Sequence, residues 1–298
     1  MRTLHCHSDN QCGIYVPHAS TMRHTMRSWS HWRFELLALA CWACANLVVY
    51  WNLTEDDSTA CQPTRAALKL YQPLTRTGQI RDSRSTLSLP YRLMPPPRIE
   101  SRKRYPLVCF LHGAGERGSD NRTQLFGLPE QLAEPEWRNT FPSFVLAPQC
   151  PETSYWTNHD AELLSLIDDV SHRYSIDPDR IYLTGLSMGG YGTWSLAARA
   201  PDRFAAIVPI CGGGDTAWAT KLIDVPIWAV HGDADPSVNV RYTREMIAAI
   251  REAGGQPRYT ELPGIGHDSW TQTYRGREGV VKWMFEQRNS RRSRSTDK

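Results

Sequence analysis

The chain has 298 residues, of which 41% are hydrophobic and 22% charged, a composition that excludes a disordered protein and fits one large globular domain with extensions. Its net charge of +3 is gathered in a basic tail over residues 289–298 and the arginine just before it, and the remainder is near neutral. No aromatic residue separates the arginines of the tail. We therefore expect a solvated, disordered end and no nucleic-acid binding.

Residues 1–51 predict a basic leader followed by a signal peptide or a membrane anchor over residues 34–51. The run 36–51 is apolar apart from Asn46, and it is shorter than the ~20 residues that a spanning helix needs. Basic residues precede the run and acidic residues follow it, which is the charge polarity of an exported or anchored protein. The folded domain is therefore expected outside the cytoplasm. A cytoplasmic protein, in which the run is a buried core helix, is the alternative.

Residues 52–83 are polar and predict a linker. The tripeptides that begin at Asn52 and Asn121 match the N-glycosylation acceptor pattern, which has meaning only in a eukaryotic secretory pathway. Cys109 and Cys211 lie within or at the end of apolar runs, so both are expected to be buried. The sequence has no CxxC…CxxC pattern typical of a zinc site, and its CxxC pair, Cys41 and Cys44, lies within the apolar run.

Between residues 84 and 288, apolar runs of strand length alternate with amphipathic runs of helix length. This alternation predicts an α/β domain with a doubly wound, mostly parallel sheet flanked by helices. Neither an internal repeat nor an insertion long enough for a large lid interrupts it. The expected strands are 85–94 (an edge strand ended by prolines), 106–112, 143–148, 181–183, 205–211, 226–231 and 258–262, and the expected helices are 161–170, 187–198, 240–253 and 270–287.

The pattern Gly185-x-Ser187-x-Gly189 stands between the strand 181–183 and the helix that follows it. A serine at the tip of a sharp strand-to-helix turn has a strained backbone and an accessible hydroxyl, and the two glycines allow strand and helix to approach closely. The pattern predicts Ser187 as a nucleophile. The N–H of Met188, at the helix N-terminus, is expected to bind a developing oxyanion.

A glycine-rich loop, residues 112–118, follows the early apolar strand 106–112. Functional groups of a parallel sheet gather in the loops after the carboxyl ends of its strands. The backbone N–H of Ala114 or Gly115 is therefore expected to supply the second half of an oxyanion hole. The alternative is a plain glycine turn.

Two later loops supply an acid and a base. Asp235, in the loop after strand 226–231, is the predicted acid that orients a catalytic imidazole; Asp233 is the alternative and otherwise caps the turn. His267 follows Gly266 just before the last predicted helix, and it is the predicted general base. The order Ser187, Asp235, His267 along the chain is the order of the triad in α/β-hydrolases.

Over roughly residues 87–286, the sequence resembles α/β-hydrolases of the serine esterase and prolyl-oligopeptidase-like branch. This branch includes bacterial predicted peptidases and phospholipase/carboxylesterase-like proteins. The resemblance implies a Ser-His-Asp hydrolase and leaves the substrate open, because the same scaffold cleaves esters, thioesters and amides. It rests on the segments 111–118, 147–151, 185–192, 231–235 and 266–270.

The predicted activity is hydrolysis of a carboxylic ester, either a small molecule or one linked to a polysaccharide, through an acyl-enzyme and without a cofactor or metal. A prolyl-oligopeptidase-like serine peptidase and a catalytically silent binding module are the alternatives. An ester is preferred to a peptide because prolyl-oligopeptidase-like peptidases usually carry a large β-propeller, whereas residues 1–83 of this sequence are too few to form one. Oligomeric state is left open. The candidates for lining the substrate pocket, for which core packing is the alternative, are Trp156, Trp218 and Trp270, with Tyr155 beside them.

Overall fold

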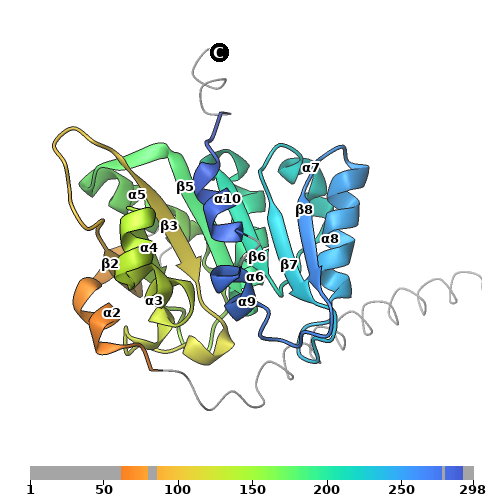
Figure 1. Cartoon of the computed structure of the whole chain (residues 1–298), viewed down its shortest axis with the longest axis horizontal. Coiled ribbons are helices and arrows are strands. Elements are labelled where there is room, and N and C mark those ends of the chain that lie inside the picture. Colours follow the sequence, from red (N-terminus) through yellow and green to blue (C-terminus); the bar gives the residue numbers. More distant parts are fainter. Residues whose placement is uncertain (1–61, 80–85, 277–278, 291–298) are drawn as a thin grey trace, which may run out of the picture. The chain divides into compact units, whose positions relative to one another are not determined.

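The computed structural model describes residues 62–79, 86–276 and 279–290. The predicted leader, the apolar run 34–51 and most of the predicted basic tail lie outside the described residues. Within the described residues, strands and helices alternate along the chain as the sequence predicts (Figure 1).

Eight strands of the described chain form one sheet. They are β1 (Gln72–Gln79), β2 (Thr86–Met94), β3 (Tyr105–Leu111), β4 (Phe144–Pro148), β5 (Ile176–Leu186), β6 (Ala206–Ile210), β7 (Trp228–Gly232) and β8 (Arg258–Leu262). Their spatial order is β1-β2-β4-β3-β5-β6-β7-β8 (Figure 1). From β4 to β8 all neighbours are parallel, whereas β2 is antiparallel to β1 and to β4. The doubly wound, mostly parallel sheet is confirmed. The chain adds β4 on one side of β3 and β5 on the other, and such a reversal of strand order is the place where these sheets bind ligands.

Helices cover both faces of this sheet (Figure 1). Those that share a buried cluster on one face are α5 (Asp160–Arg173), α6 (Met188–Arg199), α7 (Ala219–Leu222) and α8 (Arg241–Glu252). On the other face are α2 (Arg65–Leu70), α3 (Leu128–Ala133), α4 (Pro135–Thr140), α9 (Trp270–Arg275) and α10 (Val280–Glu286). Short 3-10 turns are η1 (Ala114–Glu116), η2 (Thr123–Leu125), η3 (Trp156–Asn158), η4 (Pro201–Arg203) and η5 (Thr216–Trp218).

The central strand β3 shows why its sequence is continuously apolar. Leu107, Cys109 and Leu111 pack against the helices of one face, while Val108 and Phe110 pack against those of the other. Successive side chains of a strand point to opposite faces, so a strand covered on both faces needs apolar residues at every position.

The region expected to be a linker contributes α2 and β1 to the sheet domain. Because β1 pairs along the outer side of β2, the strand that the sequence predicted as an edge is the second strand instead. Asn121 joins the two strands, since its side-chain amide donates to Leu74 in β1 and to Tyr91 in β2, at 3.2 Å each. The sequence signal was weak because β1 is polar and carries a proline and a glycine.

The helix predicted over residues 270–287 is divided into α9 and α10. Helix α9 ends at Arg275, and its C-cap Gly276 has an extended backbone. Gly279 precedes α10 with a left-handed φ of 75°. Glycine adopts that conformation without steric cost and so permits the change of direction.

We expect Tyr71, between α2 and β1, to hold this region on the domain. Its hydroxyl donates to the Pro129 carbonyl of α3 at 2.8 Å, and the residue is 1% exposed. Tyr71→Phe leaves that buried carbonyl without its donor and should lower the free energy of unfolding by about 1–2 kcal/mol in urea titrations. Tyr242→Phe, at a half-buried ring of α8, is the control. Equal unfolding midpoints for wild type and Tyr71→Phe would contradict this role.

Candidate active site

Ser187 occupies the tight turn between β5 and α6. Its φ of 53° and ψ of −117° lie outside the regions that side-chain-bearing residues normally adopt. The turn is held because the Ser187 N–H donates to the Ile210 carbonyl of β6 at 3.0 Å. A Cβ at Gly185 or Gly189 would collide with the backbone that faces it, so both positions require glycine. The strand–turn–helix context expected for Ser187 is present.

His267 lies between Ser187 and Asp235. Its Nε2 is 2.9 Å from Ser187 Oγ, and its Nδ1 is 2.7 Å from Asp235 Oδ2. Because Nδ1 faces a carboxylate oxygen, it carries the hydrogen and donates it. In the neutral ring, Nε2 then directs its lone pair at the serine hydroxyl. Three loops, after β5, β7 and β8, bring these side chains together at the carboxyl ends of the strands.

The carboxylate of Asp235 is completely shielded from solvent. Its Oδ1 accepts the backbone N–H groups of Ser237 and Val238 at 2.8 and 2.9 Å, and its Oδ2 is 3.1 Å from His231 Nε2 as well as bonded to His267. Burial alone raises the pKa of Asp235, but the hydrogen bonds from the two histidines and from Val238 outweigh it and hold the pKa well below its ordinary value. Asp235 is therefore an anion throughout the neutral range.

Asp233, the alternative acid in the sequence, has a different place. It is exposed, and its Oδ1 accepts the Gly264 N–H at 2.6 Å. Asp233 therefore ties its own loop to the loop that carries His267. Only Asp235 of the two contacts the imidazole in the described structure.

The expected oxyanion donors come from α6 and from η1. Met188 is the first residue of α6, so its N–H has no acceptor within the helix. Gly113, just before η1, lies beside the serine, since a Cβ built on it would be 3.8 Å from Ser187 Cβ. Ala114 and Gly115 follow directly in the 3-10 turn. The structure thus brings the loop with the expected donors to Ser187.

His112, for which the sequence predicted no role, holds that loop to the segment after β4. Its ring is buried, Nε2 accepts the Cys150 N–H at 2.9 Å, and Nδ1 donates to the Gly113 carbonyl at 2.6 Å. One donor and one acceptor match a neutral ring, and burial lowers the pKa of His112 to about 4. The sequence feature that could have indicated this role is a histidine standing between a buried strand and a glycine-rich loop.

Trp156 is not a pocket residue in this structure. It is 0% exposed, and its Nε1–H donates to the His112 carbonyl at 2.9 Å. Its Cβ lies directly under Gly192 of α6, where no further side-chain atom would fit. Core packing, the alternative reading of this tryptophan, is therefore correct. The sequence does not reveal whether a tryptophan at the start of a short polar 3-10 turn points into the core or into a pocket.

Trp270 and Trp218 lie closer to the surface. The Trp270 ring meets the His267 ring edge-on at 5.3 Å between centroids, and 8% of Trp270 is exposed. Trp218 ends η5, in the segment after β6, and is half-buried against the core. Tyr155 is also half-buried, beneath the Arg117 guanidinium. Trp270 is the tryptophan that contacts the candidate site directly.

One group of metal-ligating side chains comes together among the described residues. It consists of Cys211, Asp235 and His267, whose ligand atoms lie within 4.8 Å of one another. His267 and Asp235 already use these atoms for their mutual hydrogen bond. Burial raises the pKa of the Cys211 thiol well above its ordinary value, whereas a metal ligand has to be a thiolate. The chemistry of this set fits a metal poorly.

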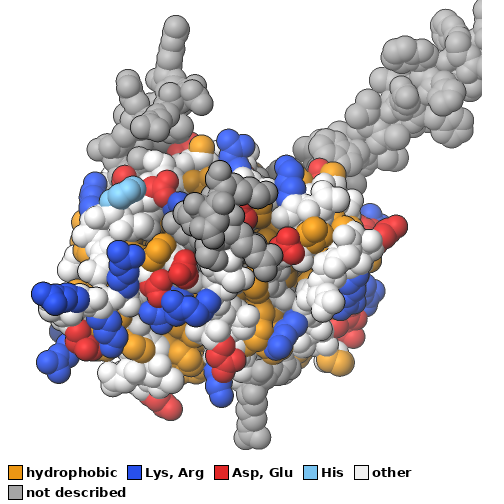
Figure 2. Space-filling model, turned by 90° about the horizontal axis from the view of Figure 1, so that it is seen from above, with side chains coloured by type: hydrophobic (Ala, Val, Ile, Leu, Met, Phe, Trp, Pro, Cys, Tyr) orange, Lys and Arg blue, Asp and Glu red, His pale blue; other side chains and the backbone are white. Residues whose placement is uncertain are grey.

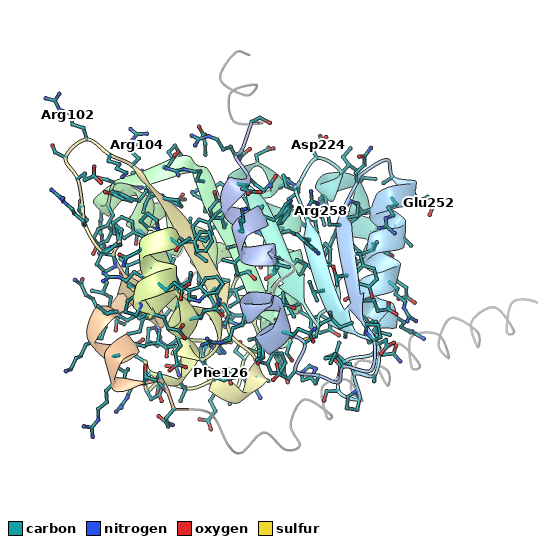
Figure 3. All side chains as sticks on the ribbon, viewed as in Figure 1. Arg102, Arg104, Phe126, Asp224, Glu252 and Arg258 are labelled. Atoms are coloured by element: carbon teal, nitrogen blue, oxygen red, sulfur yellow. The ribbon has the colours of Figure 1, made fainter. Side chains whose placement is uncertain are left out.

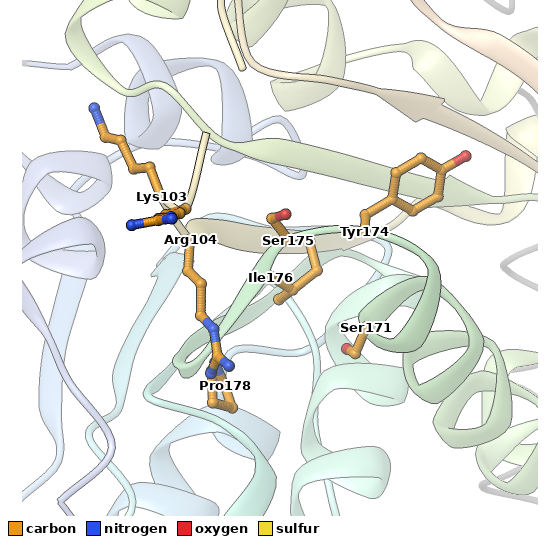
Figure 4. Close-up of a pocket in the computed structure, with 8 residues that line it drawn as sticks. Lys103, Arg104, Ser171, Tyr174, Ser175, Ile176 and Pro178 are labelled. Atoms are coloured by element: carbon orange, nitrogen blue, oxygen red, sulfur yellow. The ribbon is translucent and has the colours of Figure 1, made fainter. Parts of the chain in front are cut away.

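An open hollow of about 500 Å³ lies at the other end of the sheet. Lys103 and Arg104 line it beside the start of β3, and five residues from Ser171 to Pro178 line it around the end of α5 and the start of β5 (Figure 4). Arg104 lies at the opposite end of the domain from Phe126 (Figure 3), and acidic and basic side chains are interspersed on the face seen from this end (Figure 2). Ser187 follows the carboxyl end of β5, so the hollow is remote from it.

Comparison with known protein families assigns the chain to one of them. The model of the family described as "Putative esterase" matches residues 88–245, more than half of the chain. The chain belongs to this esterase family. The matched region includes Ser187 and Asp235, and it ends before the loop of His267.

Three relatives show how far the similarity extends. Poly(3-hydroxyalkanoate) depolymerase C of Paucimonas lemoignei is 34% identical over 36% of this chain and 28% of its own. Feruloyl esterase D of Neurospora crassa is 31% identical over 41% of this chain and 44% of its own. A thermostable esterase of known structure is 37% identical, with a TM-score of 0.68 over 74% of this chain and 64% of its own. The chain thus spans less than half the length of these two curated relatives.

The expectation of a signal peptide or anchor falls on residues 34–51, outside the described part. Within the described ranges, none of the helices has the length and apolar character needed to cross a membrane. Export or anchoring stays a prediction from the sequence.

The buried, neutral ring of His112 predicts a pH dependence of stability. Its pKa is about 4 in the folded chain and ordinarily 6.5, so the unfolded chain binds more protons between these values. The free energy of unfolding should fall by up to about 3 kcal/mol as pH drops through this window. His112→Gln should be less stable at pH 7 and should lose less stability between pH 7 and pH 4 in urea titrations. His172→Gln, at an exposed ring, is the control; the same pH dependence in wild type and His112→Gln would refute the assignment.

Proposed function

We propose that this protein hydrolyses carboxylic esters through an acyl-enzyme on Ser187. The observation that carries the proposal is the pair of hydrogen bonds made by His267, to Ser187 Oγ at 2.9 Å and to Asp235 Oδ2 at 2.7 Å. This is the geometry of a nucleophile, a base and an orienting acid.

In the first half-reaction, Ser187 Oγ attacks the carbonyl carbon of the ester while His267 Nε2 takes its proton. The imidazolium that forms is stabilised by Asp235, which is already an anion because its pKa lies well below the ordinary value. The tetrahedral intermediate expels the alcohol, and His267 donates the proton to the departing oxygen. Water, deprotonated by His267, then releases the acid from Ser187.

Backbone N–H groups stabilise the oxyanion of both tetrahedral intermediates in this proposal. Met188 supplies one donor from the first turn of α6, and Ala114 or Gly115 supplies the second from η1. The loop is pre-positioned because His112 holds it to the segment after β4. No cofactor takes part in these steps.

Esters are the favoured substrates because the family model and several relatives are named as esterases, among them a feruloyl esterase and a thermostable esterase. We propose small-molecule or polysaccharide-linked esters. Trp270, against His267, and Trp218, in the segment after β6, would line the acyl or alcohol side of the substrate. The experiment below distinguishes this function from the two alternatives, a peptidase and a catalytically silent binding module.

Ser187→Ala should reduce kcat for p-nitrophenyl acetate by roughly 10⁴-fold or more, because the covalent path is removed. The measurement compares ester and acyl-p-nitroanilide turnover for the purified variant and wild type. Ser171→Ala, at a half-buried serine of α5, is the matched control. Substantial turnover by Ser187→Ala would reject the nucleophile. Strong serine-dependent anilide cleavage would indicate a peptidase, and no labelling of wild-type Ser187 by a fluorophosphonate would indicate a binding module.

Trp218→Ala should raise KM for an aromatic acyl ester more than for the acetate, by roughly ten-fold, since one lost ring contact is worth about 1–2 kcal/mol. The two KM values are measured on the same preparation. Trp137→Ala, at a half-buried ring of α4 that packs at a tilt against Phe141, is the control. An unchanged ratio of the two KM values would remove Trp218 from the pocket.

A further inference from the structure

A second histidine, His231, touches the same carboxylate oxygen that His267 binds. It is the fourth residue of β7 and is 0% exposed. Its Nε2 lies 3.1 Å from Asp235 Oδ2 and 2.9 Å from the Val238 carbonyl oxygen. Both neighbours are acceptors, so Nε2 carries a hydrogen.

The other ring nitrogen of His231 faces a hydroxyl that is itself committed. Nδ1 is 2.7 Å from Thr243 Oγ1 in α8, and that oxygen is 2.6 Å from the Gly212 carbonyl oxygen after β6. Thr243 is 1% exposed. A hydroxyl has one hydrogen, and the Gly212 carbonyl can only accept.

The number of available hydrogens decides whether the His231 ring is neutral, with one N–H, or cationic, with two. If His231 is neutral, both Nδ1 and the Gly212 carbonyl oxygen can only accept, and the Thr243 hydroxyl has one hydrogen to donate to the two of them. One of these two acceptors then lies against the Thr243 oxygen with no hydrogen between them. With a second hydrogen on Nδ1, the ring donates to Thr243 and Thr243 donates to Gly212. Both contacts of Thr243 are then satisfied, and the Nε2 hydrogen is shared between Asp235 and the Val238 carbonyl in either state. A buried polar group left unsatisfied is costly, so the count favours the doubly protonated ring.

We propose that His231 is a positioning residue that carries hydrogens on both ring nitrogens, so that Asp235 is held between two imidazole rings and one positive charge is built into the site. This inference rests on the proposed function of Ser187, His267 and Asp235. His231 does not touch the serine, and it acts on the reaction only through Asp235.

The charges around His231 are compatible with a buried cation. Asp235 faces it from the loop after β7, and Glu261 is its register partner on β8. Hydrogen bonds from Arg244 and Tyr259 lower the pKa of Glu261 to about 2, so Glu261 is an anion and Arg244 balances it. The remaining titratable groups that face this cluster are His267, across Asp235, and the buried thiol of Cys211 at the end of β6.

A fixed positive charge on His231 has a definite consequence for His267. It opposes the appearance of a second positive charge on the other side of Asp235, and therefore favours neutral His267, the form that accepts the serine proton. The acid limb of the kcat/KM profile is displaced to lower pH as a result. Removing the charge should return this limb to higher pH by about one unit, the size expected for unit charges several Å apart in a partly screened site.

Three full-chain variants test this consequence with p-nitrophenyl acetate between pH 4.5 and 9. His231→Asn removes the ring, and Thr243→Val removes the acceptor of the Nδ1 hydrogen while keeping the Nε2 contact with Asp235. Both should move the acid limb upward by about one unit. Thr243→Ser keeps the hydroxyl and should restore the wild-type limb. A purely structural role would lower kcat without moving the limb, and that outcome would overturn the proposal.

The protonation state is read independently of activity by ¹⁵N NMR of the histidine-labelled full chain at pH 8. Two protonated nitrogens are expected on one ring, and this signal should disappear in His231→Asn. A bare Nδ1 on His231 would overturn the proposal even if the limb moved. If the protein turned over no ester, the proposed function would fail while the NMR spectrum still decided the state of His231.

Discussion

The structure depends on how closely α6 approaches the sheet. A Cβ at Gly189 would run into the Leu111 carbonyl of β3, and one at Gly190 would run into the backbone of Ile210, at the end of β6, and of Gly212. Without side chains at the contact, the helix N-terminus can sit directly over the carboxyl ends of the central strands. This approach forces the strained turn at Ser187 and places an unpaired helix N–H beside its hydroxyl.

The other parts of the site are brought to that serine by loops that are internally fastened. Asp233 holds the loop of His267 through Gly264, and the turn after Asp235 folds its own N–H groups onto the carboxylate. His112 fastens the glycine loop. Each contact is a hydrogen bond between a polar side chain and the backbone, so hydrogen bonds hold these loops in place before substrate binds. Preorganisation matters because reacting groups must be in place before charge develops.

The sequence predicted what is encoded locally and missed what depends on distant contacts. Strand periodicity and the Ser187 turn are local patterns, and the order of serine, acid and base along the chain indicated which side chains would meet. The polar strand β1 was predicted to be a linker because it is held by pairing with β2 and by contacts of Asn121, which its own residues do not reveal. Trp156 was placed in a pocket because apolar character does not tell core from cleft. The partners of His231 are 4, 7 and 12 residues away, and only the fold shows that they converge on one ring.

Asn121 has a consequence for producing this chain in a host that glycosylates secreted proteins. It begins an acceptor tripeptide, yet its side-chain nitrogen donates to Leu74 and Tyr91, and its backbone N–H donates to Gln149 at 2.6 Å. A sugar on that nitrogen would replace one of its two hydrogens and so remove one of its two contacts with β1 and β2. A chain that acquires the glycan is therefore expected to hold β1 less firmly than a chain without it.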